Sequence, residues 1–334
     1  MPMKKPFVFA SCMAGIIALI GACDGSVSTA TRADAAADPT GPDAAPGAPD
    51  ATPPGETADA AVDPTPDATA LPPPPDTWQE HWFEHNQLLK LVDYNDTVAM
   101  YFDDDVNRQG TDWIVPFMTS LWEYTKATYG DLGPDRLYLV FHEGKYSGGH
   151  PSTYFDSSHD FRNVTDCGPG PWQSGYDIPS HEAGHIVESA LHGVHGSPAF
   201  GLWGDSKWME FYQYDAYVAL GMPGEAQRLF DKFTGTSDDF PRAGTHWFRD
   251  WFYPLWRDHG HAQVMVKYFQ LEAQYFPKNG HDYARDMNFG EFVHFMSGAA
   301  GTNLKALATT AFGWPADRET QFNAARAAFP QITY

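Results

Sequence analysis

The sequence predicts an α+β protein in which a small sheet-bearing N-terminal lobe, about residues 78–195, precedes a mostly α-helical lobe at 196–334. Two observations predict this class. A predicted strand that runs into an acidic turn at 96–106 and a more apolar strand at 136–142 flank a stretch with helical spacing at 110–129, which gives the order strand, helix, strand. In the second half of the chain the apolar residues recur at helical spacing, without an internal repeat of solenoid length. We therefore expect a sheet beside the first helix of the second half and an all-helical region after it.

The helical half is expected to begin with a helix that starts near Pro179–Ser180 and fades near Gly193. Before this helix, the segment at 148–151 is expected to be a loop because it contains two glycines and a proline. Later helices fit the ranges Ser206–Leu220, Pro223–Phe233, Thr245–Asp258, His261–Tyr275, Phe289–Met296, Asn303–Phe312 and Arg318–Ala328.

The first 22 residues are predicted to be a targeting segment rather than part of the fold. Lysines near the start are followed by an apolar run at 7–20, which is shorter than the roughly 20 residues that a membrane-spanning helix needs. The run ends in Ile-Gly-Ala-Cys, which resembles a lipobox, so we expect Cys23 to carry the lipid and to begin the mature protein. The alternative is an ordinary signal peptide that is cleaved near Ala22.

Residues 23–77 are rich in alanine, proline and aspartate and contain almost no bulky apolar side chain. Such a segment cannot bury enough surface to offset its ordering entropy, so it is predicted to be a disordered linker. Its prolines and like charges keep it extended. The sequence thus predicts a catalytic domain at 78–334 that is anchored by lipid to a bacterial membrane and faces the periplasm or the cell surface.

The charge and the cysteine content narrow the classes of partner. The net charge of −22 argues against nucleic acid as a partner and favours solubility outside the cell. Cys167 is the one cysteine of the predicted domain, so no disulfide can form within it. We interpret this residue as a small buried side chain rather than a nucleophile, and we expect the domain to be a monomer.

The segment at 181–185 reads His-Glu-Ala-Gly-His and is the most informative motif of the chain. On a helix, positions i and i+4 lie on the same face, so the rings of His181 and His185 can reach one metal ion. Glu182 projects away from this pair but stays near the ion, where it can accept a proton from metal-bound water. Because a zinc hydrolase needs two nitrogen ligands and such a base, we expect the cofactor to be Zn²⁺.

A catalytic zinc ion usually has three protein ligands, and the third must come from another element. Glu210 is the leading candidate, because the aromatic residues around it would bury it and an unpaired buried carboxylate is costly. The alternative is a surface or ion-paired glutamate. Asp205 could also serve as the third ligand, but it is better explained as the N-cap of the helix that carries Glu210. Glu188 is expected to be a helix-surface or ion-paired residue, and Leu191 occupies the position where a metzincin carries its third ligand.

The two histidines and the later glutamate resemble the gluzincin zinc metallopeptidases, whose pattern is H-E-x-x-H followed by a glutamate on a later helix. The resemblance covers residues 179–217. It implies that zinc is bound by His181, His185 and Glu210, and that Glu182 is the general base.

Three further residues are candidates for supporting roles. Many gluzincins carry an acidic residue four positions after the glutamate ligand, which orients the first histidine. Here that position is Tyr214, and Asp215 follows it, so Asp215 is the candidate for this role. Tyr217 and His246 are candidates for stabilising the oxyanion, and each has an alternative interpretation as an aromatic core or interface residue.

Three functions follow from this pattern. The first is a zinc peptidase in which Glu182 takes a proton from zinc-bound water and passes it to the leaving amine, with a protein or peptide substrate paired along the strand at 136–142. The second is a zinc hydrolase of a non-peptide amide in a cell wall or glycoconjugate. The third is a binding module for glycan or protein without turnover, against which the presence of Glu182 argues.

Overall fold

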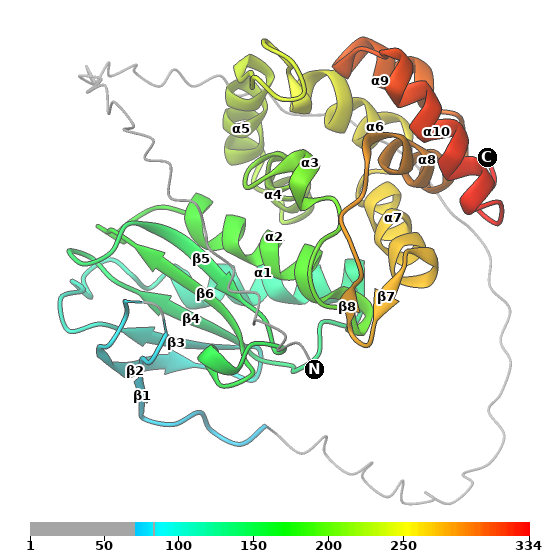
Figure 1. Cartoon of the computed structure of the whole chain (residues 1–334). Helices are drawn as coiled ribbons and strands as arrows, with labels where there is room; N and C mark the ends of the chain where they lie inside the picture. The colour runs from blue at the N-terminus through cyan, green and yellow to red at the C-terminus, as the bar shows by residue number, and fades with distance from the viewer. Residues whose placement is uncertain (1–70, 83) are drawn as a thin grey trace, which may run out of the picture. The chain divides into compact units, whose positions relative to one another are not determined.

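The structure of the protein, a computed structural model, describes residues 71–82 and 84–334 (Figure 1). The predicted signal peptide, the lipidation site Cys23 and nearly all of the predicted linker lie outside the described residues. The described part of the chain falls within the compact unit Pro64–Tyr334. In this part no helix has both the length and the apolar character that crossing a membrane requires.

A six-stranded mixed sheet forms the first half of the described chain, with the strand order β1-β2-β3-β4-β6-β5 (Figure 1). Its strands are β1 (Thr77–Gln79), β2 (Leu88–Tyr94), β3 (Val98–Phe102), β4 (Leu137–Phe141), β5 (Gly148–Ser152) and β6 (Asn163–Gly168). β3, β4 and β6 run parallel, and the other neighbouring pairs are antiparallel. The strands predicted at 96–106 and 136–142 are β3 and β4.

Strand β5 forms an edge of the sheet where the sequence predicted a loop. Two glycines and a proline give the segment a low strand propensity, but tertiary pairing overrides this preference. Its backbone pairs with β6, which sets Gly149 opposite Cys167 and His150 opposite Asp166. Pro151 is tolerated because an edge strand can leave one side of its backbone unpaired.

Strand β4 is an interior strand with β3 on one side and β6 on the other. Both of its edges are therefore occupied, and the expectation that an extended peptide pairs along residues 136–142 is wrong. Cys167, on the neighbouring strand β6, is fully buried in the core. This burial agrees with its interpretation as a small core residue.

Helices α1 (Ile114–Tyr129) and α2 (Asp177–Ala190) cover one face of the sheet (Figure 1). α1 connects β3 to the parallel strand β4, as such a crossover requires. α2 begins two residues before the expected start at Pro179 and ends at Ala190, where a short 3₁₀ turn (Leu191–Gly193) follows. The apolar residues of both helices pack on alternate residues of β3 and β4.

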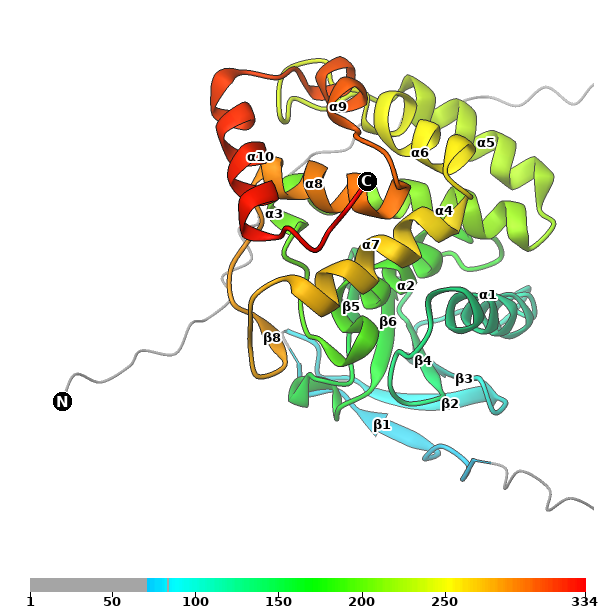
Figure 2. The same ribbon diagram turned by 90° about the vertical axis from the view of Figure 1, so that its right-hand side faces the viewer.

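The second half of the described chain is helical apart from one short hairpin (Figure 2). Its elements are α3 (Phe200–Trp203), α4 (Lys207–Ala219), α5 (Pro223–Gly235), a π-helical turn (Phe248–Phe252), α6 (Tyr253–Asp258), α7 (Ala262–Tyr275), the strands β7 (Lys278–Asn279) and β8 (Asp282–Tyr283), α8 (Phe289–Ala300), α9 (Lys305–Phe312) and α10 (Ala316–Ala328). Each helical range predicted from the sequence contains a helix, and the α+β class is confirmed.

Two hydrophobic clusters hold these layers together. The larger one extends from Val98 in the sheet to Ile332 near the C-terminus, so the sheet and the helices share one core. The smaller one lies on the opposite face of the sheet and includes Trp78, Trp82 and Tyr101. Because side chains alternate along a strand, each central strand contributes to both clusters. Both faces of the sheet are thus covered.

Candidate active site

Helix α2 brings the two motif histidines together. The Nε2 atoms of His181 and His185 lie 3.2 Å apart. Two nitrogens that bind one tetrahedral zinc ion at about 2.0–2.1 Å are separated by about 3.3 Å, so this separation fits a shared ion. Burial, and then the neighbouring His185, lower the pKa of His181 to about 3. Its imidazole is therefore neutral, which is the form that binds a metal.

A buried carboxylate holds the ring of His185 in place. Its Nδ1 lies 2.8 Å from Oε1 of Glu188, and Trp203 donates its indole N–H to the other oxygen of Glu188 at 2.8 Å. This contact leaves Nε2 of His185 free to face His181. A carboxylate behind a metal-binding histidine fixes the ring orientation and increases its basicity. The carboxylate that contacts a motif histidine is thus Glu188.

Glu182 faces a cavity of about 430 Å³, which His181, Glu210 and Gly149 also line. Burial raises the pKa of its carboxyl to about 7, close to the value at which a general base works best near neutral pH. Gly149 of β5 approaches so closely that a Cβ at this position would collide with the carboxylate of Glu182. Strand β5 therefore forms one wall of the site.

Helix α4 brings Glu210 to the same cavity. α4 packs closely on α2 at Gly184, where a Cβ would lie 3.0 Å from the ring of Tyr212. The indole N–H of Trp208 also donates to the carbonyl of Gly184 at 3.1 Å. The glycine inside the motif thus permits the close packing of α4 on α2.

The carboxyl of Glu210 is buried without a fully compensating cation. Burial raises its pKa to about 8, although Lys207 and Lys232 act in the opposite direction. A divalent ion would supply the missing charge. Two imidazoles and one carboxyl group are the donor types of a catalytic zinc site, and His181 and Glu210 line the cavity. Among the described residues, Glu210 does not form with the two histidines a group whose ligand atoms all lie within 4.8 Å of one another. His181, His185 and Glu210, with Glu182 beside them, are called the α2 site below.

The structure places Asp215 on the side of α4 that faces α1. Its carboxylate accepts hydrogen bonds from the hydroxyl of Tyr124 and, at 2.7 Å, from the indole of Trp256. These groups account for both oxygens of Asp215. Asp215 therefore does not orient the first motif histidine as expected, and the carboxylate of Glu188 contacts the second one, His185.

The two residues considered for the oxyanion do not line the cavity. The hydroxyl of Tyr217 lies 3.0 Å from the hydroxyl of Ser180 and donates to Asp177 at 3.1 Å. It therefore supports the first turn of α2 from behind. His246 precedes the π-helical turn and is half-buried. Neither residue belongs to the described residues that border the cavity.

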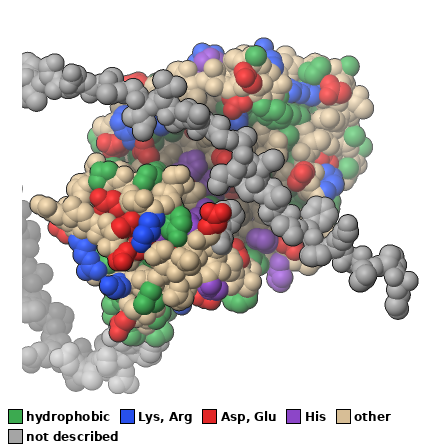
Figure 3. Space-filling model, turned by 60° about the vertical axis from the view of Figure 1, so that its left-hand side comes forward, with side chains coloured by type: hydrophobic (Ala, Val, Ile, Leu, Met, Phe, Trp, Pro, Cys, Tyr) green, Lys and Arg blue, Asp and Glu red, His purple; other side chains and the backbone are tan. Residues whose placement is uncertain are grey.

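Lys232 and Gln213 are among the cavity-lining residues that the sequence did not predict. Lys232 of α5 is the one Lys or Arg among the described residues that line the cavity. Gln213 of α4 also borders it, with its amide group donating to the carbonyl of Asp177 at 2.7 Å. On the face shown in Figure 3, histidine side chains gather near the middle, close to acidic ones. No local motif marked these residues, because only the docking of α4 and α5 brings them to α2.

No protein-family model matches the sequence, and no curated protein matches it either. Among solved structures, the chain resembles a mutant of an M1 zinc metallopeptidase from Deinococcus radiodurans bound to a Tyr-Ser-Ala substrate, with 8% identity, a TM-score of 0.43 and coverage of 69% of this chain and 50% of that chain. A mutant of a two-domain M1 zinc metallopeptidase with bound L-tryptophan has 9% identity, a TM-score of 0.38 and coverage of 75% and 50%.

A further likeness is to a mutant of a functionally unknown conserved protein from Bacillus anthracis str. Ames, with 13% identity, a TM-score of 0.41 and coverage of 68% of this chain and 50% of that chain. The chain thus spans about half the length of each of these structures. Likenesses this distant assign no activity to the chain.

Proposed function

We propose that this protein is a zinc-dependent metallopeptidase. One observation carries the proposal: the Nε2 atoms of His181 and His185 face each other at 3.2 Å, beside a cavity that Glu182 and Glu210 also line. The α2 site thus combines a possible three-ligand zinc site with a buried base and space for a substrate. Zinc bound there would polarise a carbonyl group and increase the acidity of water.

The chain itself supplies the proton transfer and the positioning. Glu182, with its pKa raised to about 7 by burial, can accept a proton from the attacking water and later give it to the leaving amine. Glu188 keeps the ring of His185 in its orientation. Lys232, which lines the same cavity, supplies a positive charge for the developing oxyanion in place of Tyr217 or His246.

The substrate is proposed to be an extended peptide that pairs with strand β5. This strand is the edge of the sheet, and its Gly149 lines the cavity directly against Glu182. An unpaired strand edge can add one more strand through main-chain hydrogen bonds. Such pairing would place a backbone carbonyl of the substrate beside Glu182.

The cellular setting is proposed from the sequence alone. The lipobox-like segment that ends at Cys23 and the acidic, proline-rich linker after it support a domain that is lipid-anchored to a bacterial membrane. The catalytic domain would then work as a monomer in the periplasm or at the cell surface. Its substrates would be proteins or peptides in that compartment.

The test combines metal analysis with a peptide library. Residues 64–334, the compact unit, are purified with zinc and incubated with a mixed peptide library. We expect zinc-dependent cleavage that is lost on chelation and in Glu182→Gln. The matched control is Glu123→Gln, which alters an exposed carboxylate on α1 and should leave cleavage unchanged.

Two outcomes would replace the proposal. Bound zinc with cleavage of a non-peptide amide, such as a peptidoglycan cross-link, and of no peptide would favour the cell-wall hydrolase. Bound zinc without turnover of either substrate, together with glycan or protein binding, would favour the binding module.

A further inference from the structure

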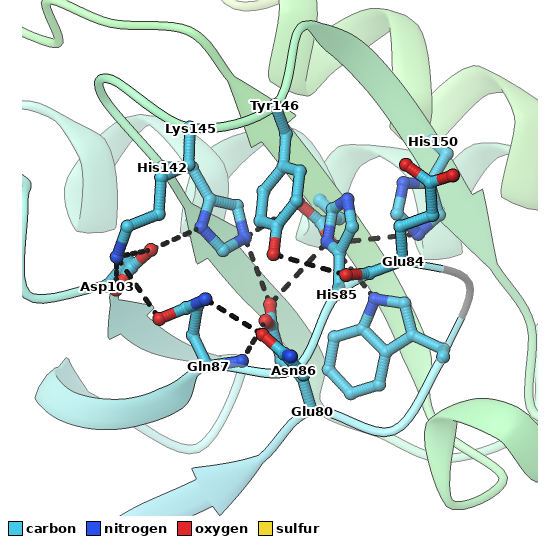
Figure 4. A network of polar contacts seen from close by, with 12 residues as sticks. Glu80, Glu84, His85, Asn86, Gln87, Asp103, His142, Lys145, Tyr146 and His150 are labelled. Carbon is cyan, nitrogen blue, oxygen red and sulfur yellow. Dashed lines mark hydrogen bonds and ion pairs between the residues drawn. The ribbon is translucent and has the colours of Figure 1, made fainter.

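A second group of side chains that could hold a metal ion lies on the face of the sheet opposite α2 (Figure 4). Glu80, His85, His142 and Asp166, called the sheet cluster below, each offer one atom, and these four atoms lie within 4.8 Å of one another. The four residues are 0–8% exposed. Buried charged groups are costly unless they are paired or bind a metal, so this cluster requires an explanation.

Four separations within the sheet cluster, which involve both oxygens of Asp166, are close to those between the ligands of one zinc ion. Nε2 of His142 lies 3.0 Å from Oε1 of Glu80 and 3.4 Å from Oδ1 of Asp166. Nδ1 of His85 lies 3.0 Å from Oδ2 of Asp166 and 3.6 Å from Oε1 of Glu80. Ligand atoms that bind one zinc ion at about 2.0–2.1 Å are separated by about 3.3 Å. The four separations lie on both sides of this value.

The inward atoms of the sheet cluster lack hydrogen bonds. Among the described residues, Oε1 of Glu80, Nδ1 of His85 and Nε2 of His142 are buried and have no partner with acceptable hydrogen-bond geometry. Their separations are short, but their orientations do not suit donation from one to another. Buried polar atoms without partners are rare in native proteins and often indicate an ion that occupies the space between them.

The outward atoms of the same side chains are held by other groups. Nδ1 of His142 lies 3.0 Å from the carboxylate of Asp103, and Oε2 of Glu80 accepts the backbone N–H of Gln87 at 2.8 Å. The ring of Tyr146 stacks on His85 with 3.5 Å between centroids. Such outer contacts orient metal ligands and fix the tautomer of a ligating histidine. The inward atoms are thus positioned in advance.

We propose that the sheet cluster binds a second divalent metal ion, zinc by its donor set, in a closed structural site separate from the α2 site. The four residues leave no exposed coordination position, and a closed four-ligand site is typical of structural rather than catalytic zinc. The ion ties the segment between β1 and β2, which carries Glu80 and His85, to β4 and β6. This inference does not depend on the proposed peptidase activity.

The bound ion would also stabilise the wall of the α2 site. His150 of β5 pairs directly with Asp166, and its Nε2 lies 3.6 Å from Oδ2 of that residue. The preceding residue, Gly149, faces the other side of the sheet and touches Glu182. The ion and the general base thus lie on opposite sides of the same short edge strand.

The competing interpretation is an ion-pair network without metal. Burial by itself lowers the pKa of His85 and of His142. Asp166 and Glu80 more than offset this effect, so the pKa is raised to about 9 for His85 and to about 10 for His142. Two protonated imidazoles would then neutralise the two carboxylates. One divalent ion would replace these two protons at the same total charge. Metal content therefore distinguishes the two interpretations directly.

The experiment uses the untagged full chain with the double substitution His181→Ala/His185→Ala, which removes the α2 site and leaves the sheet cluster intact. Bound metal is measured after dialysis against zinc-containing buffer and desalting. The bound zinc is then replaced by Co²⁺. We expect about one metal ion per chain, the visible absorption of tetrahedral Co²⁺ and a higher melting temperature with metal than without it. The wild-type chain should hold one ion more.

Substitutions in the cluster complete the test. Adding Glu80→Gln and Asp166→Asn, which keep the side-chain shapes, should abolish the remaining metal and the Co²⁺ spectrum. The matched control is His294→Asn, which alters a buried histidine that contacts Tyr334 and the carbonyl of Phe329 and should leave the metal in place. If the further substitutions unfold the chain, the metal content of the His181→Ala/His185→Ala variant, whose sheet cluster is intact, still tests the proposal. If that variant is folded and binds no zinc or Co²⁺ at micromolar concentration, the proposal is overturned.

Discussion

The two histidine–carboxylate groups of this protein lie on opposite sides of the same sheet and differ in their access to solvent. The α2 site borders a cavity, and strand β5 contributes Gly149 to its wall. The sheet cluster is covered by the segment between β1 and β2. Its residues are 0–8% exposed and Glu182, His185 and Glu210 are 4–8% exposed, so the bordering cavity rather than burial separates the two groups. Similar side chains can therefore serve two purposes. An open position allows chemistry, whereas a closed set of ligands can only stabilise the fold.

The electrostatic environments of the α2 site and the sheet cluster also differ. In the α2 site, burial raises the pKa of Glu182 and Glu210, and no neighbouring cation of the chain fully offsets it. In the sheet cluster, burial also raises the pKa of Asp166, but the neighbouring imidazoles of His142 and His85 lower it well below its usual range. Carboxyls with raised pKa values beside a cavity are suited to acid–base work. Carboxylates that are already paired are suited to holding a cation.

The largest expected effect is on the rate of hydrolysis, which distinguishes the α2 site from the sheet cluster. Glu182→Gln keeps the shape of the side chain but removes the proton acceptor, so hydrolysis should fall by about 10²–10⁴-fold. Zinc content and melting temperature should not change, because Glu182 is not among the proposed ligands. Steady-state kinetics with metal analysis of the same sample measures both. Retention of full activity would remove Glu182 from the mechanism.

The second prediction concerns the wall that the two groups share. Gly149→Ala places a methyl group against the carboxylate of Glu182 and should displace it. A displacement of roughly 1 Å can cost about 10²-fold in rate, so kcat should fall by about this factor while zinc remains bound. The matched control is Gly224→Ala on α5, where no atom lies within 4 Å of the added Cβ. Equal kcat values for the two variants would contradict the placement of β5.

The third prediction tests which carboxylate orients a motif histidine. Glu188→Gln weakens the contact with Nδ1 of His185, so zinc affinity of the α2 site should fall by about 10–100-fold. Asp215→Asn should leave that affinity unchanged, because Asp215 is bound by Tyr124 and Trp256 instead. Zinc titration against a competing chelator measures both constants. A larger loss of affinity in Asp215→Asn than in Glu188→Gln would reverse the assignment.

The sequence predicted the elements whose signals are local. Helical spacing identified α1 and the helices after residue 206, and the i, i+4 spacing placed His181 and His185 on one face of α2. Glu210 was selected because aromatic neighbours would bury it, and it does line the cavity. The role of Glu188 was missed, although its i, i+3 spacing from His185 was a usable signal.

The remaining features depend on contacts that are distant in the sequence. Strand β5 has a glycine- and proline-rich sequence and exists because β6 supplies its hydrogen bonds. The residues of the sheet cluster lie between positions 80 and 166, and only the pairing of β4 with β6 and the fold of the segment between β1 and β2 bring them together. No spacing rule in a single sequence identifies such a group. Similarly, Lys232 reaches the cavity only because α5 docks on α4.

A third buried carboxyl sharpens the comparison, because it has a raised pKa but lies in neither group. Glu272 of α7 is 1% exposed, and its Oε1 has no hydrogen-bond partner among the described residues. Burial raises its pKa well above 4.5, although a hydrogen bond with Tyr268 acts in the opposite direction. A raised pKa alone therefore does not identify a site, and a bordering cavity is also required.

The smallest expected effect follows from this residue. Because the pKa of Glu272 is higher in the folded than in the unfolded state, its stabilising contribution is complete below about pH 4.5 and is lost as the pH rises. Glu272→Gln removes this pH dependence and should increase the free energy of unfolding at pH 8 by about 1–2 kcal/mol, with little difference near pH 4. Urea unfolding at both pH values measures the change. A variant that is less stable than wild type at pH 8 would show that the charged carboxylate has a compensating partner in the folded chain.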